Sequence, residues 1–343
     1  MSFRGLKKAT AGNDESFYRS ADNASGSEPQ GDLPADATHV PLIENATDAA
    51  AFFEADHELV AGTGWLLCRE ELDSKFDYLF VDEAGQISLA DALALGTCAK
   101  TIVFLGDPNQ LPQVSQGAMP EAAKVSVLQH LLGEEEATVP SDRGIFLAET
   151  WRLRPELAAF TSEAYYAGRL ECAPPCEKRS VAAGDGLVFC PVEHAGNTQL
   201  SWEEAEEVAK AIEALVDTTH TDENGVTRPL THDDVLVVTP YNAQVRTLRH
   251  VLPESVRVGT VDKFQGQEAP VVVVSLASSS AAQAPRGLDF VFNRNRINVA
   301  TSRAQCRVEL VCSPRLLEAD CKTVEQMTLV NALCRFVELA ERR

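Results

Sequence analysis

The chain has 343 residues, of which 45% are hydrophobic and 24% are charged, and its formal net charge is −21. This composition is typical of a folded protein of about two domains, and it excludes a wholly disordered chain. The excess of acidic residues argues against binding nucleic acid through bulk charge, although a local site remains open.

Along the chain, residues 1–40 are rich in small and polar types and are expected to form a loop or disordered segment. Residues 46–53 have a helical pattern, with Thr47 as a candidate N-cap. Short, continuous apolar runs rich in β-branched residues predict buried strands at 59–61, 78–81, 101–105, 234–238 and 271–276. Helical patterns lie at 90–98, 119–132, 156–166, 202–216, 243–251 and 325–342.

This alternation of strands and helices predicts an α/β fold with parallel sheets and flanking helices. We expect two α/β units in tandem, a partial first domain over residues 41–140 and a second over 141–343. Nine cysteines without a C-x-x-C pair favour reduced thiols. The reduced thiols suit a cytoplasmic protein. No membrane-length apolar run or secretory signal is visible, so we expect no membrane partner.

Polar residues follow two of the predicted strands directly. Asp82 and Glu83 come after the strand at 78–81, where the first acid could hold Mg²⁺ and the second could activate water. Gln110 lies in the turn 106–112 after the next strand and could contact a phosphate or the attacking water. Taken singly, each segment could equally be an ordinary surface turn.

Two later segments combine residue types that suit a nucleotide. Trp151 could stack on a base, and the planar guanidinium of Arg152 beside it could bind a phosphate. A helix-start cluster with a core Trp is an equal alternative. Residues 259–268 form a small, polar turn before a buried strand, and Glu268 could accept a hydrogen bond from a ribose hydroxyl.

The segment 286–315 reverses the charge of the chain, with six arginines and only two acids. We expect it to face an anionic group such as phosphate, or equally to pair with acids elsewhere. On a helix, Arg296 and Arg303 would share one face because they are seven residues apart, and Arg303 would suit an arginine finger. An exposed basic helix face is the alternative.

In this order, the motifs resemble those of the superfamily 1 helicases, in the 5′-to-3′ branch that includes the nonsense-mediated-decay helicase. The resemblance covers roughly residues 59 to 315, and bacterial fusions of a RecB-like nuclease to such a helicase are the most specific relatives that it suggests. It implies tandem RecA-like domains, the first incomplete here, with ATP and Mg²⁺ as ligands. It also implies single-stranded nucleic acid as partner, with DNA favoured over RNA.

The resemblance also implies roles for individual residues. Asp82 would hold Mg²⁺, Glu83 would activate water, and Gln110, Arg152 and Arg303 would contact the γ-phosphate. Trp151, Gln265, Gly266 and Glu268 would bind the nucleotide, with Glu268 on the ribose. The loops that touch the strand would carry Thr239, Tyr241, Thr260 and Asp262.

One motif of this family is missing from the sequence. A phosphate-binding loop needs G-x-x-x-x-G-K-[ST], and the chain contains no Gly-Lys dipeptide. We therefore expect the C-terminal part of a longer helicase, inactive without its N-terminal helicase or nuclease portion. A non-catalytic nucleic-acid-binding or regulatory module derived from a helicase is the alternative, as is a remnant without function.

Overall fold

The computed structural model describes residues 4–8, 42–46, 59–112, 125–133 and 137–342. The chain divides into two compact units, one of Met1–Gly106 with Ser115–Val127 and one of Asp107–Val114 with Leu128–Arg343. This division differs from the expected boundary at 140/141, because residues 107–112 and 128–133 belong to the second unit. The predicted helix at 46–53 lies outside the described residues except for Ala46, which ends a strand.

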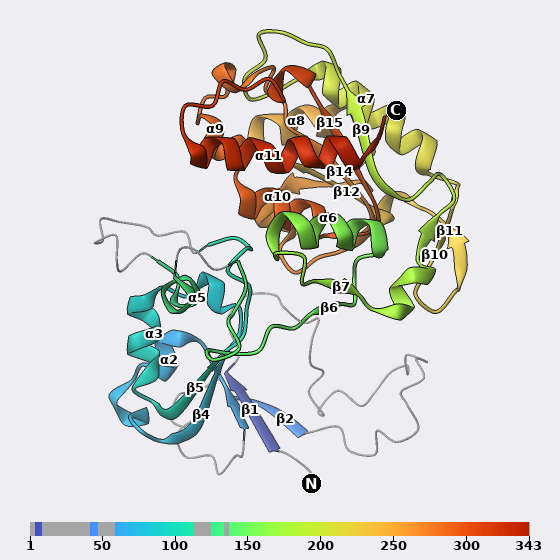
Figure 1. Ribbon diagram of the computed structural model, residues 1–343. Helices are drawn as coiled ribbons and strands as arrows, with labels where there is room; N and C mark the ends of the chain where they lie inside the picture. The colour runs from blue at the N-terminus through green and yellow to red at the C-terminus, as the bar shows by residue number, and fades with distance from the viewer. Residues whose placement is uncertain (1–3, 9–41, 47–58, 113–124, 134–136, 343) are drawn as a thin grey trace. The chain divides into compact units, whose positions relative to one another are not determined.

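The first unit is built on parallel strands (Figure 1). Strands β1 (Arg4–Lys8), β2 (Leu42–Ala46) and β3 (Leu59–Ala61) form one sheet in the order β2-β1-β3, so the expectation of a loop over residues 1–40 is wrong for Arg4–Lys8. Strand β4 (Phe76–Val81) pairs in parallel with β5 (Ala99–Phe104). Helices α2 (Gly64–Leu67) and α3 (Leu89–Gly96) belong to the same unit, and Ser88 caps α3 by accepting from the Asp91 amide.

The second unit contains a six-stranded parallel sheet in the order β13-β12-β14-β15-β9-β16. Its strands are β9 (Gly186–Pro191), β12 (Val235–Thr239), β13 (Arg257–Thr260), β14 (Ala269–Ser275), β15 (Ala304–Cys312) and β16 (Glu341–Arg342). Its helices are α6 (Pro155–Tyr165), α7 (Trp202–Leu215), α8 (Asn242–Val251), α9 (Leu288–Val291), α10 (Arg294–Thr301) and α11 (Val324–Leu339). Helix α5 spans Val127–Leu132. Strand β6 (Glu149–Thr150) pairs with β7 (Glu171–Cys172). Strand β10 (Thr219–Thr221) pairs with both β8 (Ser180–Val181) and β11 (Thr227–Pro229).

Both faces of this sheet are covered by helices, as the unbroken apolar runs predicted. Along β12, Val235 and Val237 pack with α7 and α8, whereas Leu236 and Val238 pack on the opposite face with α6, α10 and α11. Figure 1 shows these two helix layers on either side of the sheet. The period-two alternation of a strand therefore splits the apolar residues between two cores. The α/β fold with RecA-like parallel sheets is confirmed.

Buried polar side chains join the loops at one end of this sheet. Glu204 of α7 is fully buried, and its carboxylate accepts from the Ser275 hydroxyl at 2.7 Å and the Ala277 amide at 2.9 Å. His194 lies 2.9 Å from Glu204 through Nε2 and 2.7 Å from the Ser279 hydroxyl through Nδ1. These bonds fix Ala277, whose φ of 65° is left-handed, at the end of β14.

Asp234 joins strand β12 to the preceding turn by a paired charge. Its carboxylate accepts two hydrogen bonds from Arg228, at 2.6 and 2.7 Å, and further bonds from the amide and hydroxyl of Thr231. Burial alone would raise the pKa of Asp234, but the bonds from Arg228 and Thr231 lower it from 3.8 to about 2. A lowered folded-state pKa stabilises the protein above the unfolded value, and this stabilisation disappears as the pH falls through about 2.

We expect Asp234→Asn to lower the free energy of unfolding at pH 7 by roughly 1–2 kcal/mol, after allowance for solvent screening of the half-exposed Arg228. The difference from the wild type should shrink as the pH falls from 4 toward about 2, because the wild-type carboxylate is then protonated. Urea unfolding across this pH range measures it, with Asp233→Asn as the matched exposed control. A difference that is independent of pH would contradict the ionic role.

Candidate functional site

In the first unit, the two predicted acids occupy a tight turn after β4. Asp82 and Glu83 are exposed, and the Asp82 carboxylate accepts from the Glu83 amide at 2.9 Å. The next residue, Ala84, is fully buried and donates through its amide to the Leu105 carbonyl at the end of β5. Leu105, directly after β5, therefore holds the turn that follows β4. The carboxylates of Asp82 and Glu83 both face solvent. Glu83 has a left-handed φ of 52°.

In the second unit, Gln110 contacts Arg303 directly. The Arg303 guanidinium donates to Gln110 Oε1 at 3.1 Å, and Gln110 Nε2 donates to Asp107 Oδ2 at 3.1 Å. Arg303 is only 2% exposed, and Tyr166 donates its hydroxyl to the same Asp107 oxygen at 2.5 Å. Burial and then the charge of Asp107 raise the pKa of Tyr166, so its hydroxyl stays protonated as a donor. Asp107 thus orients the Gln110 amide toward the arginine.

Helix α10 holds the same loop through its asparagines. Asn298 is fully buried and donates to the Asn109 carbonyl at 2.9 Å and to the Tyr166 hydroxyl at 3.0 Å. Asn295 donates to the carbonyls of Pro108 and Gln110. Sequence reasoning assigned no role to Asp107, Tyr166 or Asn298. Asp107 lies in the turn 106–112, Tyr166 ends the predicted helix 156–166, and Asn298 lies in the basic segment 286–315. The bond between Asp107 and Tyr166 joins residues 59 positions apart.

Arg152 and Glu268 also meet directly. The Arg152 Nε donates to Glu268 at 2.5 Å, and Gln305 donates to the other Glu268 oxygen at 2.8 Å. Burial acts to raise the pKa of Glu268, but Arg152 and Gln305 lower it overall, so the carboxylate is ionised at neutral pH. The buried Arg179 donates to the Arg152 carbonyl and binds Glu223, which fixes the turn that carries Arg152.

The other residues expected to touch a nucleotide lie close to Arg152 or Glu268 in the sequence. Trp151 precedes Arg152, and its side chain is 65% exposed, so its ring is available for stacking. Gln265 and Gly266 follow the short helix at Val261–Phe264. Gly266 has a left-handed φ of 76°, a conformation that glycine adopts without strain.

The four residues expected to touch a nucleic-acid strand lie at the carboxyl ends of two adjacent strands. Thr239 ends β12 and is the register partner of Thr260, which ends β13. Tyr241 follows Thr239 and is 5% exposed, and Asp262 follows Thr260 and is exposed. Parallel sheets bind ligands at this edge, so the structure brings these four residues to one suitable place.

The expectation that Arg296 and Arg303 share a helix face is wrong. Helix α10 ends at Thr301, so Arg303 lies in the turn before β15. Arg296 instead stacks on Phe290, with its guanidinium carbon 4.2 Å from the ring centroid. The helix cannot continue to Arg303 because β15 begins at Ala304, and the Arg303 carbonyl accepts from the Ala269 amide at the start of β14.

The fold and these motifs define the chain as a superfamily 1 helicase-like region with RecA-like parallel sheets. The chain belongs to the AAA domain family: the model described as "AAA domain" matches residues 123–315, more than half of the chain, and a second model with the same description matches residues 35–131.

Its relatives include proteins named as a DNA replication helicase/nuclease and as an RNA helicase. The chain is 27% identical over 250 residues to the DNA replication ATP-dependent helicase/nuclease DNA2 of Gallus gallus, covering 71% of this chain and 24% of that protein. It is 30% identical over 285 residues to the RNA helicase Mov10l1 of Mus musculus, covering 71% of this chain and 23% of that protein. The chain therefore spans about a quarter of the length of these relatives.

Among solved structures, the chain is similar to the Arterivirus nonstructural protein 10 helicase in its complex with DNA. The two are 16% identical, with a TM-score of 0.42 over 96% of this chain and 57% of that chain. In the described part of the chain, no helix is both long and apolar enough to span a bilayer.

Proposed function

We propose that this chain is part of an ATP-dependent helicase, in which hydrolysis drives translocation along single-stranded nucleic acid, with DNA favoured over RNA. The observation that carries the proposal is the contact of Arg303 with Gln110 at 3.1 Å. An arginine fork and a neutral amide that meet in this way are the two groups expected to contact a γ-phosphate. The exposed Trp151 beside Arg152 suits base stacking.

The residues of the first unit fit a nucleotide–Mg²⁺ substrate. Mg²⁺ takes oxygen ligands and binds through one or two carboxylates together with phosphates and water, and Asp82 offers an exposed carboxylate. The described residues contain no cluster of three or more acids, histidines and cysteines that would make a protein-only metal cage. Bound Mg²⁺ would neutralise the developing phosphate charge. Asp82 would hold it, and Glu83 would orient and deprotonate the attacking water.

Hydrolysis also requires a phosphate-binding loop, which we propose comes from an additional segment or partner. Two measurements test the function. The chain should bind a labelled 20-nucleotide single strand in fluorescence anisotropy. It should hydrolyse ATP only when it is fused to, or mixed with, a helicase segment that carries G-x-x-x-x-G-K-[ST]. Turnover by the chain alone would contradict the requirement for the loop, and failure to bind any single strand would contradict the nucleic-acid assignment.

In such a fusion, Glu83→Gln should abolish ATP hydrolysis and leave ATP binding unchanged, because the amide keeps the shape of the side chain but cannot take a proton. Turnover and the binding of a fluorescent ATP analogue measure the two effects. Glu71→Gln, an exposed change of equal charge in the same unit, is the matched control. Normal turnover by Glu83→Gln would exclude the role in water activation.

A further inference from the structure

The proposed nucleotide site gives a role to only some of the arginines in the basic segment 286–315. Arg303 binds Gln110, Arg294 donates to the Ala164 carbonyl, and Arg307 forms an ion pair with Glu309 at 2.6 Å. Within the described part of the chain, no ion pair includes Arg286 or Arg296. Pairing with distant acids, the alternative left open by the sequence, therefore does not account for Arg286 and Arg296.

Arg286 and Arg296 are both held against one aromatic ring. Their guanidinium carbons lie 4.5 and 4.2 Å from the centroid of Phe290, and the ring of Tyr241 lies 5.4 Å from that of Phe290. Burial raises the pKa of Tyr241, whereas the hydrogen bond with Ser278 and the charges of both arginines act to lower it. Two cations are thus fixed close together by contacts that leave their N–H groups available.

A groove of about 200 Å³ opens beside this cluster. It is lined by Phe290 and Arg296 together with Leu111, Pro112, Asp262, Asp289 and Asn293. Its polar lining therefore combines one arginine with two carboxylates and an amide. The guanidinium can bind a phosphate, whereas the carboxylates can accept hydrogen bonds from a sugar or a base but repel a free anion, and the neutral amide can hydrogen-bond a sugar or a base. This mixed lining suits a nucleotide unit within a strand better than a compact inorganic anion.

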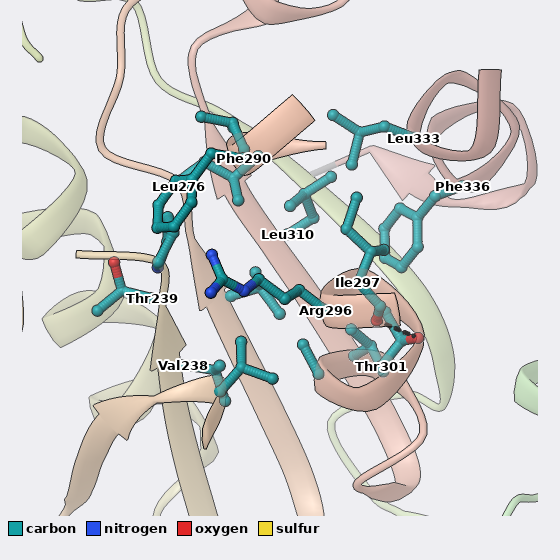
Figure 2. Close-up of a pocket in the computed structure, with 16 residues that line it drawn as sticks. Val238, Thr239, Leu276, Phe290, Arg296, Ile297, Thr301, Leu310, Leu333 and Phe336 are labelled. Atoms are coloured by element: carbon teal, nitrogen blue, oxygen red, sulfur yellow. Dashed lines mark hydrogen bonds between the residues drawn. The ribbon is translucent and has the colours of Figure 1, made fainter. Parts of the chain in front are cut away.

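Behind Phe290, the same arginine crosses an apolar cavity of about 30 Å³ (Figure 2). Arg296 is the one charged side chain in its lining, and Figure 2 shows its guanidinium beneath Phe290, directed to the side where Thr239 lies. The Thr239 hydroxyl is fully buried and has no hydrogen-bond partner within the described residues. A buried hydroxyl without a partner costs free energy unless a ligand satisfies it.

We propose that Arg286 and Arg296, positioned by Phe290, bind the phosphate backbone of the single strand beside Asp262. This inference rests on the proposed function and extends the strand-binding surface beyond the residues that the motifs identified. The contact is to phosphate, so it should be independent of base sequence and common to DNA and RNA.

The test is the affinity of the full chain for labelled (dT)20 and (rU)20, measured by fluorescence anisotropy from 0.05 to 0.3 M salt. One lost phosphate contact should change the slope of log K against log salt by about 0.7, or roughly fivefold in affinity at 0.1 M salt. Arg286→Ala should lower the affinity roughly fivefold and the slope by about 0.7 for both (dT)20 and (rU)20. The double variant that also carries Arg296→Ala should lose about twice as much of the slope. Because Arg286 is exposed, its variant should fold even where Arg296→Ala does not.

Phe290→Leu separates position from charge. Both arginines remain, so affinity should fall a few-fold through loss of the ring, while the salt slope stays that of the wild type. Arg335→Ala is the control, because this arginine is paired with Glu163 on the surface, and its affinity and slope should equal those of the wild type.

Three outcomes would overturn the inference. Wild-type binding with an unchanged slope in Arg286→Ala would leave the proposed function standing and remove only this site. If Arg286→Ala keeps its strand affinity but binds inorganic tripolyphosphate more weakly than the wild type, the arginines would be assigned to a free polyphosphate. Absence of strand binding by the wild type would contradict the proposed function as well.

Discussion

Replacing Arg303 by alanine in a fusion that carries the phosphate-binding loop is expected to reduce ATP hydrolysis by roughly 10³–10⁵-fold. The guanidinium is almost fully buried, and Gln110 orients it from one side. A charge held in a site of low dielectric can stabilise the transferring phosphoryl group without reorganisation. Initial rates at saturating ATP, together with ATP affinity, measure the effect, and the affinity should change much less than the rate.

Arg315→Ala changes an exposed arginine that lies shortly after β15, the strand that Arg303 precedes. This variant should keep wild-type turnover. Arg303→Lys retains the charge but lacks the planar fork, so most of the loss should persist. Thermal unfolding of each variant separates catalytic loss from misfolding. A well-folded Arg303→Ala chain with less than a tenfold loss would assign Arg303 a structural role.

Removing the buried carboxylate of Glu204 is expected to give the largest loss of stability. Glu204→Ala leaves His194, the Ser275 hydroxyl and the Ala277 amide without their shared acceptor in a buried site. Breaking such a network costs about 3–5 kcal/mol. In a unit of this size that corresponds to a fall of about 10 °C in Tm, which calorimetry or circular dichroism would measure.

Glu206→Ala changes an exposed residue of the same helix and should shift Tm by less than about 2 °C. Glu204→Gln keeps one acceptor oxygen and should fall between the two. Equal Tm values for Glu204→Ala and Glu206→Ala would show that the network contributes little to folding.

The buried strands of the second sheet could be predicted where they are uniformly apolar. Strands β12 and β14 were found because each reads as an unbroken run of apolar residues. Strand β15 was missed because Arg307 and Glu309 interrupt its run, yet both are buried since they bind each other. Strand β13 was missed because its four residues include an arginine and a glycine.

The candidate site was predictable as a set of positions but not as a set of contacts. The sequence indicated Arg152 and Glu268 separately, and the structure joins them across 116 residues. No pattern indicates the role of Glu204, since the run Glu203-Glu204-Ala205-Glu206-Glu207 resembles a solvated helix face. Such partners follow from tertiary proximity, which no local pattern encodes. The catalytic and binding roles of the site residues stay predictions.

The left-handed backbone at Glu83 has a consequence for how this turn can vary. A residue with a β-carbon in this conformation is less stable by about 1 kcal/mol than glycine would be. Glycine would relax the turn, and asparagine would tolerate it, but neither has a side-chain carboxylate. The chain is therefore strained at Glu83, so a replacement that stabilises the turn would remove the group proposed to activate water.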